Sequence, residues 1–247
     1  MEDILVSGYS ESDKNELSDH LISLVFPKDK IDVLDSGYVS LKHVSPVPVG
    51  EYGCDYSIVE AARVSLGIGI KDIISDKKLI SFLKKNRHTS PFEHITFSFV
   101  IKCPIFVARH IMRHRTFSYN EISARYTEVN DDFYVPDILR QQSKSNRQCS
   151  TSDRVGEDIG LIQDIRESYR RSYELYEKMV LRGVSREQAR IVLPVGTYTT
   201  FLMTGNLKNW LHFLSLRDDK DAQYETRVYA QAIRSIIEKY TPLSSKV

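Results

Sequence analysis

The sequence predicts an α+β protein in which long helices pack against a small mixed or antiparallel sheet. Apolar residues recur at helical spacing over several segments, the longest of which is 157–182. Segment 94–103 instead alternates apolar and polar side chains, as a strand with one buried face does. Helical and strand patterns do not alternate regularly along the chain, which favours this class over a parallel α/β sheet.

The bulk properties of the chain limit its organisation. Its 247 residues suit one large domain, which we expect over 31–247 after an N-terminal extension over 1–30 that contains a short helix. The formal net charge is +1, so there is no broad basic surface for nucleic acid or for a membrane. No segment reaches the ~18 apolar residues of a membrane span, and no signal-peptide pattern is present. The scattered cysteines predict a reduced, cytoplasmic protein.

The first half of the predicted domain combines short strands, a loop and two helices. Alternating residues indicate the strands, prolines and glycines mark the loop, and apolar residues at intervals of three and four indicate the helices. In chain order we expect two strands in 31–44 around Ser36-Gly37, a loop over 46–53, and helices over 58–66 and 77–86. Asp76 is the candidate N-cap of the second helix.

The second half begins with the clearest strand, 94–103, which leads through Pro104 into a helix ending near Met112. Beyond it, polar composition marks a mobile surface loop, and apolar stripes mark the helices. We expect a turn over 130–136, the mobile loop over 141–155, and a helix over 157–182 that ends at Gly183. A capping box of Ser185 and Gln188 then opens a helix over 186–192. The remaining elements are a strand over 197–204, a helix from the cap Asn206 to about 216, and a last helix over 221–239.

The most informative stretch runs from Arg113 to Tyr126 and reads Arg-His-Arg-Thr-Phe-Ser-Tyr-Asn-Glu-Ile-Ser-Ala-Arg-Tyr. The leading basic residues suit the negative end of the preceding helix, so a plain C-terminal cap is one interpretation. That interpretation leaves unexplained the histidine between two arginines and the hydroxyl, amide and carboxylate groups that follow. Guanidinium forks combined with neutral donors suit phosphates, which indicates a site for a small anionic ligand.

Two other chemistries are disfavoured by the sequence. His110 and His114 stand four residues apart, as two zinc ligands on a helix do, but the zincin pattern needs Glu where this chain has Ile111. The nearby arginines would also oppose a dication, so we expect no metal. Cys103 ends a predicted buried strand and has no base nearby in sequence, so we interpret it as core rather than as a nucleophile.

Arg113-His114-Arg115, followed after seven residues by Ser123, resembles the signature of the flavin-dependent thymidylate synthases. Four further segments are similar to other blocks of that family, in the same order: 90–94, 104–109, 189–194 and 213–217. The resemblance covers roughly 31–240, and several correctly spaced blocks are far more specific than one.

The resemblance implies methylation of dUMP to dTMP, with methylenetetrahydrofolate as carbon donor and FAD, reduced by NADPH, as hydride carrier. It also implies a homotetramer with sites at subunit interfaces. No GxGxxG pattern occurs, so we expect a non-Rossmann flavin-binding fold. The alternative is a non-catalytic nucleotide- or RNA-binding protein that uses the same arginines.

Residue-by-residue matching implies the roles of individual positions. Those expected to bind FAD are Ser65, Ser90, Glu93, Arg113, His114, Arg115, Asn206, Lys208 and His212. Those expected to bind dUMP are His110, Arg113, Glu121, Ser123, Ala124, Arg125, Arg190 and Arg217. The catalytic candidates are Arg217, Ser123 and His88, the last of which matches a histidine near the folate pocket. His110 replaces a frequent Gln, and Lys208 replaces a frequent Arg, which keeps the charge but loses the fork.

Ser123 has two interpretations. A serine nucleophile needs an adjacent base, and by resemblance only Glu121 and His88 qualify. Binding a phosphate through the hydroxyl and the following amides needs no such activation, so we expect Ser123 to bind the nucleotide.

Overall fold

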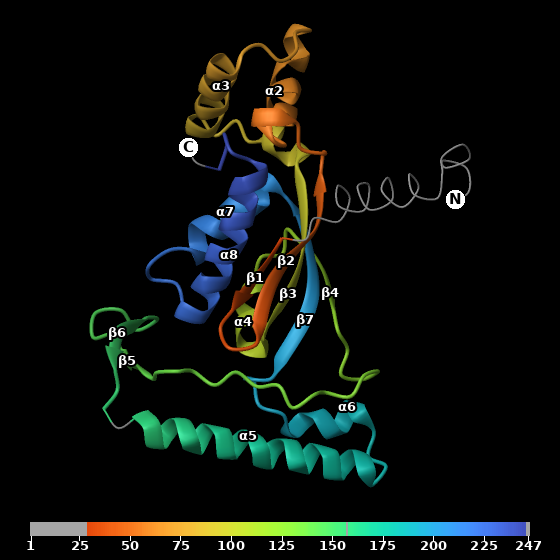
Figure 1. The fold of residues 1–247 in the computed structure, drawn as a ribbon, viewed down its shortest axis with the longest axis vertical. Helices are drawn as coiled ribbons and strands as arrows, with labels where there is room; N and C mark the ends of the chain where they lie inside the picture. The colour runs from red at the N-terminus through yellow and green to blue at the C-terminus, as the bar shows by residue number, and fades with distance from the viewer. Residues whose placement is uncertain (1–28, 157, 246–247) are drawn as a thin grey trace, which may run out of the picture.

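The computed structural model describes residues 29–156 and 158–245. Within them, five antiparallel strands form one sheet in the order β1-β2-β3-β7-β4. These strands are β1 (Lys30–Val33), β2 (Gly37–Ser45), β3 (Thr96–Pro104), β4 (Ser118–Glu121) and β7 (Tyr198–Asn206). An antiparallel sheet packed against helices confirms the predicted α+β class (Figure 1).

The helices are distributed over one face and both ends of the sheet (Figure 1). Those on the face are α7 (Leu207–Arg217) and α8 (Tyr224–Tyr240), and α4 (Ile105–Ile111) follows β3 directly. Those at one end are α2 (Tyr56–Arg63) and α3 (Ile73–Lys85), and those at the other are α5 (Asp158–Leu181) and α6 (Arg186–Ala189). Short 3-10 helices complete the set: η1 (Gly50–Tyr52), η2 (Val64–Leu66), η3 (Ser90–His94) and η4 (Arg190–Val192). No described helix is long and apolar enough to span a membrane.

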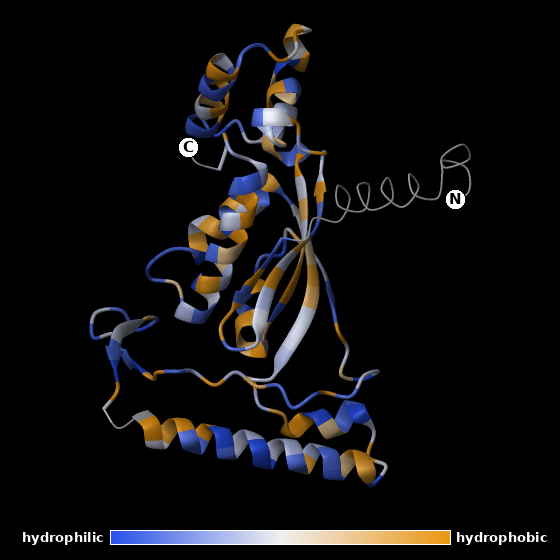
Figure 2. Ribbon diagram, viewed as in Figure 1, coloured by the Kyte–Doolittle hydropathy of each residue, from blue (hydrophilic) through white to orange (hydrophobic). Residues whose placement is uncertain are grey.

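The core lies between the sheet and the helices α7 and α8, where the ribbon is mostly apolar (Figure 2). Trp210 of α7 is fully buried and packs edge-on against Phe99 of β3, with ring centroids 5.0 Å apart. It also packs against Phe117, with ring centroids 4.6 Å apart, and its indole N–H donates to the carbonyl of Gly205 at 3.1 Å. The segment that follows the Arg-His-Arg turn is therefore anchored in the core.

Most predicted elements are present, but the start of α3 and the capping box and length of α6 were predicted wrongly. Helix α3 begins at Ile73, because the extended backbone of Asp72 lets its carboxylate accept the amide N–H groups of Ile74 and Ser75 at 3.1 and 3.0 Å. Asp76, the predicted cap, lies buried inside that helix. Ser185 makes no side-chain capping bond, and α6 is a single turn that continues as η4 rather than one helix over 186–192.

Three further regions add detail to the prediction. The predicted mobile loop 141–155 contains most of a surface hairpin of β5 (Arg140–Gln142) and β6 (Ser150–Arg154). Strand β4 was not predicted, because its side chains are half-exposed or exposed and show no apolar alternation. The expected extension falls largely on residues 1–28, which lie outside the described residues.

A buried ion pair connects α2 to α3. Arg63 of α2 and Asp76 of α3 are both buried, and their nitrogen and oxygen atoms lie 2.5 Å apart. Arg63 also donates to the carbonyl of Gly69 at 2.8 Å, and the hydroxyl of Tyr52 donates to Asp76 at 2.8 Å. The pair thus fixes the segment 64–72, which carries Ser65 and joins the two helices.

Candidate active site

The Arg-His-Arg turn follows α4 and is held by hydrogen bonds from β4. Helix α4 ends at Ile111, so Arg113, His114 and Arg115 lie beyond it. The Tyr119 hydroxyl donates to the carbonyls of Ile111 and His114, at 3.1 and 2.8 Å. The carbonyl of Ile111 also accepts the amide N–H of His114 at 3.1 Å, so the tyrosine adds to a turn that the backbone already closes.

Arg217, at the end of α7, meets this turn. Its Nε donates to Nε2 of His114 at 2.9 Å, and a terminal nitrogen donates to the carbonyl of His110 at 3.4 Å. The His114 ring packs edge-on against Phe213, with centroids 4.9 Å apart, and lies 6.3 Å from the His212 ring. The structure therefore brings together four of the predicted site residues, from two elements distant in sequence.

The surroundings of His110 and His114 lower the pKa of both side chains. Burial, and secondarily Arg217 and His212, lower the pKa of His114 from its usual 6.5 to about 4. Burial and Arg217 also lower the pKa of His110. A neutral His114 can accept a hydrogen bond from Arg217 at Nε2 while its other nitrogen donates.

The pKa of His114 predicts how stability depends on pH. Unfolded His114 takes up a proton near pH 6.5, whereas the folded chain resists protonation until about pH 4. Protonation therefore favours unfolding, and we expect stability to fall as pH decreases from 6.5 to 4. His114→Gln should reduce this dependence in urea titrations across that range. Equal slopes for the two proteins would contradict the assignment.

A second group of predicted residues lies at the end of the sheet nearest α2. Ser90 and Glu93 of η3 and Lys208 of α7 line a pocket of about 600 Å³ that also contains His88. Lys208 Nζ and a Glu93 oxygen lie 2.6 Å apart, and both side chains are partly exposed. Because this ion pair is partly exposed, its charged groups form a polar wall of the pocket to which a ligand could hydrogen-bond.

Helix α7 connects this pocket with the Arg-His-Arg turn. Asn206 caps the helix, since its side-chain oxygen accepts the amide N–H of Asn209 at 3.0 Å. The Asn209 side chain in turn donates to the carbonyl of Thr116 at 3.1 Å. The cap prediction for Asn206 is confirmed, and this interaction gives it a structural role besides any contact with a ligand.

A third group lines a cleft of about 750 Å³ between β4, β7 and η4. Its predicted members are Glu121, Ala124 and Arg190. A Glu121 oxygen accepts the hydroxyl of Thr199 at 2.6 Å, and Arg190 is exposed. Arg109 of α4 lines this cleft and also the 650 Å³ pocket formed with His110, Arg113 and Arg217, so the two spaces are adjacent.

Ser123 and Arg125 lie in the loop after β4. The Ser123 hydroxyl accepts the amide N–H of Arg125 at 3.3 Å, and its carbonyl accepts those of Tyr126 and Thr127, each at 3.0 Å. Arg125 pairs loosely with Glu187 of α6 at 3.6 Å. The carboxylate of Glu121 is directed to Thr199, so the described contacts give Ser123 a backbone donor rather than a base.

The burial of Cys103 and the arrangement of possible metal ligands bear on the two chemistries that the sequence disfavours, a cysteine nucleophile and a metal site. Cys103 is fully buried in the core, which confirms its prediction as a core residue, and burial raises its pKa well above the usual value. Among residues 29–156 and 158–245, no group of three or more His, Cys, Asp or Glu side chains is arranged to hold a metal ion.

Sequence reasoning missed two arginines that line these pockets. Arg109 of α4 stands four residues before Arg113, a helical spacing, and both side chains line the 650 Å³ pocket. Arg87 follows α3 and lines the pocket of His88 and Ser90. The sequence could have drawn attention to Arg87 by its position, because it stands just past a helix end, where glycine is the usual residue.

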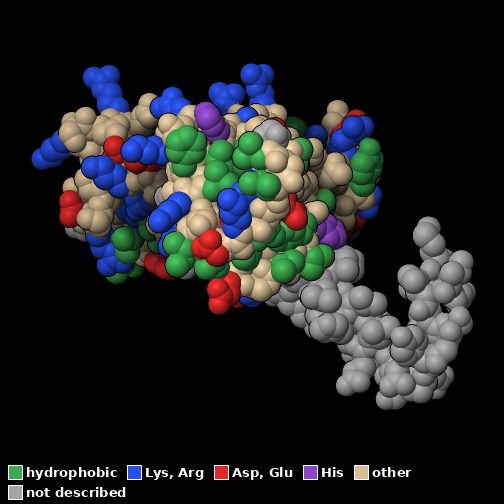
Figure 3. Space-filling view, turned by 90° about the horizontal axis from the view of Figure 1, so that it is seen from above, with side chains coloured by type: hydrophobic (Ala, Val, Ile, Leu, Met, Phe, Trp, Pro, Cys, Tyr) green, Lys and Arg blue, Asp and Glu red, His purple; other side chains and the backbone are tan. Residues whose placement is uncertain are grey.

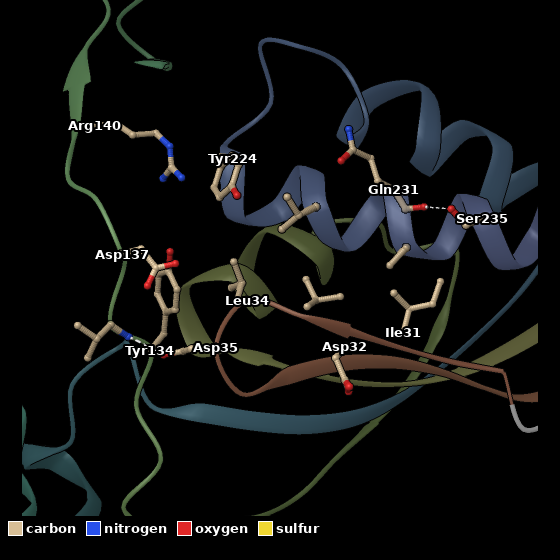
Figure 4. Close-up of a pocket in the computed structure, with 14 residues that line it drawn as sticks. Ile31, Asp32, Leu34, Asp35, Tyr134, Asp137, Arg140, Tyr224, Gln231 and Ser235 are labelled. Atoms are coloured by element: carbon tan, nitrogen blue, oxygen red, sulfur yellow. Dashed lines mark hydrogen bonds between the residues drawn. The ribbon is translucent and has the colours of Figure 1, made fainter. Parts of the chain in front are cut away.

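A separate pocket of about 550 Å³ lies between β1, the first turns of α8 and the segment 134–140 (Figure 4). Arg140 stacks over the ring of Tyr224 at 3.5 Å and pairs with Glu225 at 3.1 Å. None of the predicted flavin or nucleotide residues is among those that line this pocket. We therefore do not include it in the candidate active site.

The fold is of the α+β class, and arginines line three of its pockets, where they are suited to an anionic ligand. The family model described as "Thymidylate synthase complementing protein" matches residues 51–243. A flavin-dependent thymidylate synthase of Thermus thermophilus is 44% identical over 215 residues, covering 87% of this chain and 76% of the relative. One of Kosmotoga olearia is 43% identical over 219 residues, covering 87% of this chain and 91% of the relative.

Solved structures agree with the sequence comparisons. The UMP/dUMP methylase PolB of Streptomyces cacaoi, bound to 5-bromo-dUMP, is similar with a TM-score of 0.76. The two chains are 34% identical, and the similarity covers 87% of this chain and 96% of PolB. The chain belongs to the family of the flavin-dependent thymidylate synthases.

Proposed function

We propose that the protein methylates dUMP to dTMP, with methylenetetrahydrofolate as carbon donor and with FAD reduced by NADPH. The observation that carries the proposal is the 2.9 Å hydrogen bond from Arg217 to His114. It joins the residue expected on the pyrimidine to a residue expected on the flavin. A reaction that passes a hydride between these ligands requires such proximity.

The chemistry that FAD supplies is hydride transfer to the donated carbon, and the protein supplies binding and orientation. The residues present fit this cofactor. Arg113, His114, Arg115 and His212 surround a pocket of about 610 Å³, and guanidinium donors suit a pyrophosphate. Ser90, Glu93 and Lys208 add polar groups around the second pocket. Ser65, on η2, lies on the segment fixed by the Arg63–Asp76 pair.

The nucleotide is expected at the adjoining cleft. Arg125 and Arg190 are exposed and carry charge suited to the phosphate, and Ser123 adds a hydroxyl. Arg217, partly buried at the end of α7, is suited to the pyrimidine carbonyls, where it would stabilise negative charge as carbon 5 becomes nucleophilic. This arrangement needs no protein nucleophile, in agreement with the buried Cys103.

We further propose that the active unit is a homotetramer with sites at its interfaces. The α5–α6 end exposes large apolar side chains, with exposed fractions of 76% for Ile159, 87% for Leu181 and 75% for Ile191. Helix α5 also runs apart from the sheet (Figure 1). Exposed apolar side chains spread along α5 and on η4 favour contact with another copy. The described cysteines are all free thiols, which supports a cytoplasmic location.

Three single variants test how the site divides between its ligands. Ser123→Ala removes one hydrogen bond to a charged group, so we expect dTMP turnover to fall by roughly one to two orders of magnitude and remain measurable. Arg125→Ala should weaken dUMP binding at least as much and leave FAD bound. Arg113→Ala should instead reduce FAD retention. The measurements are dUMP titration of the flavin spectrum and single-turnover reoxidation with methylenetetrahydrofolate.

These variants also separate the proposal from its alternatives. A folded, flavin-loaded Ser123→Ala protein that binds dUMP normally and forms no dTMP would show that Ser123 is a nucleophile. A non-catalytic nucleotide- or RNA-binding protein would bind no flavin at all, and its affinity would fall steeply with salt.

A further inference from the structure

Arg87 stands in a backbone conformation that suits glycine better than arginine. It follows the end of α3 with φ of 57°, in the left-handed region. The amide N–H of Arg87 donates to the carbonyl of Lys84 at 3.1 Å, and that of His88 donates to the carbonyl of Leu83 at 2.8 Å. This is the hydrogen-bond pattern of a helix ending at which glycine is the usual residue.

The side chain of Arg87 lines the 600 Å³ pocket that contains the proposed flavin residues Ser90, Glu93 and Lys208. Arg87 is exposed, whereas Lys208 is engaged by Glu93 at 2.6 Å. Lys84, on the same helix end, donates to the carbonyl of Ser244 at 3.2 Å. Lys208 and Lys84 are thus engaged in other contacts, and Arg87 is the exposed cation of the pocket wall that is positioned to bind an anion. Arg87 thus adopts a backbone conformation that disfavours arginine, and its side chain lines a ligand pocket. Unfavourable conformations of this kind cluster at functional sites.

The rest of the pocket wall indicates what kind of anion fits. Apolar side chains share the lining with Arg87: Ala61, Ala62, Leu83 and Pro91. The end of the molecule that carries α2 and α3 also displays hydrophobic side chains with Lys and Arg around them (Figure 3). An apolar wall beside one guanidinium suits an aromatic ring that ends in a carboxylate. A phosphate dianion would instead attract several donors.

We propose that Arg87 binds the α-carboxylate of the glutamate that ends the p-aminobenzoyl arm of methylenetetrahydrofolate. The inference rests on the proposed function, because the folate must bring its carbon to a flavin held beside Ser90 and Glu93. The guanidinium forms a bidentate contact with the carboxylate, and the apolar wall receives the aromatic ring. Arg87 thus contributes to the affinity for the folate without taking part in the chemistry.

The test compares wild-type holoenzyme with Arg87→Gly, and with Lys85→Ala as the matched control. Lys85 is an exposed cation two residues away that lies outside the pocket lining. Glycine relaxes the left-handed backbone, so we expect the thermal midpoint of Arg87→Gly to stay the same or rise by roughly 1–3 °C. Its KM for methylenetetrahydrofolate should rise about tenfold or more, with kcat, KM for NADPH and flavin content unchanged. Lys85→Ala should match the wild type throughout.

A binding measurement removes any dependence on turnover. Equilibrium dialysis with 5-formyltetrahydrofolate should show a dissociation constant about tenfold higher or more for Arg87→Gly. With 5-formyltetrahydropteroate, which lacks the glutamate, wild type and variant should bind equally. Equal affinities for the complete folate, or the same loss with both compounds, would overturn the proposal. A rise confined to the KM for NADPH, or loss of FAD, would also overturn it. A wild-type protein that binds the folate through its glutamate but forms no dTMP would instead refute the proposed function and leave the Arg87 site intact.

Discussion

Arg217→Ala should lower the turnover number for dTMP by roughly 100- to 1000-fold, the range seen when a preorganised donor to developing charge is removed. The side chain is expected on the pyrimidine carbonyls, and its 2.9 Å bond to His114 fixes its orientation. Because Arg217 is partly exposed at the end of α7, its loss should leave the fold intact. Single-turnover formation of dTMP, with circular dichroism to verify folding, measures this effect.

Arg217→Lys is the matched control for charge. Lysine keeps the cation but loses the planar fork, so it should recover only part of the lost activity. If Arg217→Lys were as active as the wild type, a point charge would suffice and the orienting role of His114 would be wrong. If Arg217→Ala kept normal turnover, the assignment of this arginine to the pyrimidine would fail.

Asp76→Asn should produce the largest loss of stability among polar substitutions discussed here. Removing one partner of a buried ion pair leaves an uncompensated charge on Arg63, which costs about 3–5 kcal/mol. For a chain of this size, that corresponds to a thermal midpoint lower by roughly 10 °C. Calorimetry of the flavin-free and flavin-loaded protein measures the shift, and flavin affinity should also fall because the pair fixes the segment 64–72.

Asp72→Ala provides the comparison for Asp76→Asn. Asp72 is the exposed N-cap of the same helix, so its loss should cost only about 1 kcal/mol. Replacing both partners, as Arg63→Met with Asp76→Leu, should recover much of the lost stability, since no charge remains buried. An Asp76→Asn protein no less stable than Asp72→Ala would contradict the account of the buried pair.

The periodicity of apolar residues in the sequence predicts the position of most elements of the fold. Strand β3 and helices α7 and α8 bury one face in regular patterns, and α5 carries a long apolar stripe at helical spacing, so the positions of these elements follow from the sequence. The start of α3 did not follow, because Asp72 and Asp76 are both plausible caps and only the extended backbone at Asp72 decides between them. Strand β4 was missed because its pairing with β7 is a tertiary effect that its four residues do not encode locally.

The candidate site also combines features that the local sequence predicts with features that only tertiary contacts decide. The Arg-His-Arg stretch could be found from the sequence, because its density of cations and hydroxyls has no structural explanation of its own. Its contact with Arg217 joins residues 103 positions apart, and no local pattern predicts such a distance. The sequence shows only that Arg87 follows a predicted helix end, whereas the role inferred for it depends on its backbone angle and on the pocket wall, which require the structure.

The most direct test of the central claim combines the absorption spectrum with product formation. We expect the purified protein to be yellow, to release FAD on denaturation, and to convert dUMP to dTMP with methylenetetrahydrofolate and NADPH. Removing FAD should abolish product formation, and adding it back should restore it. A colourless protein that cannot be reconstituted with FAD, or one that forms dTMP without it, would contradict the account.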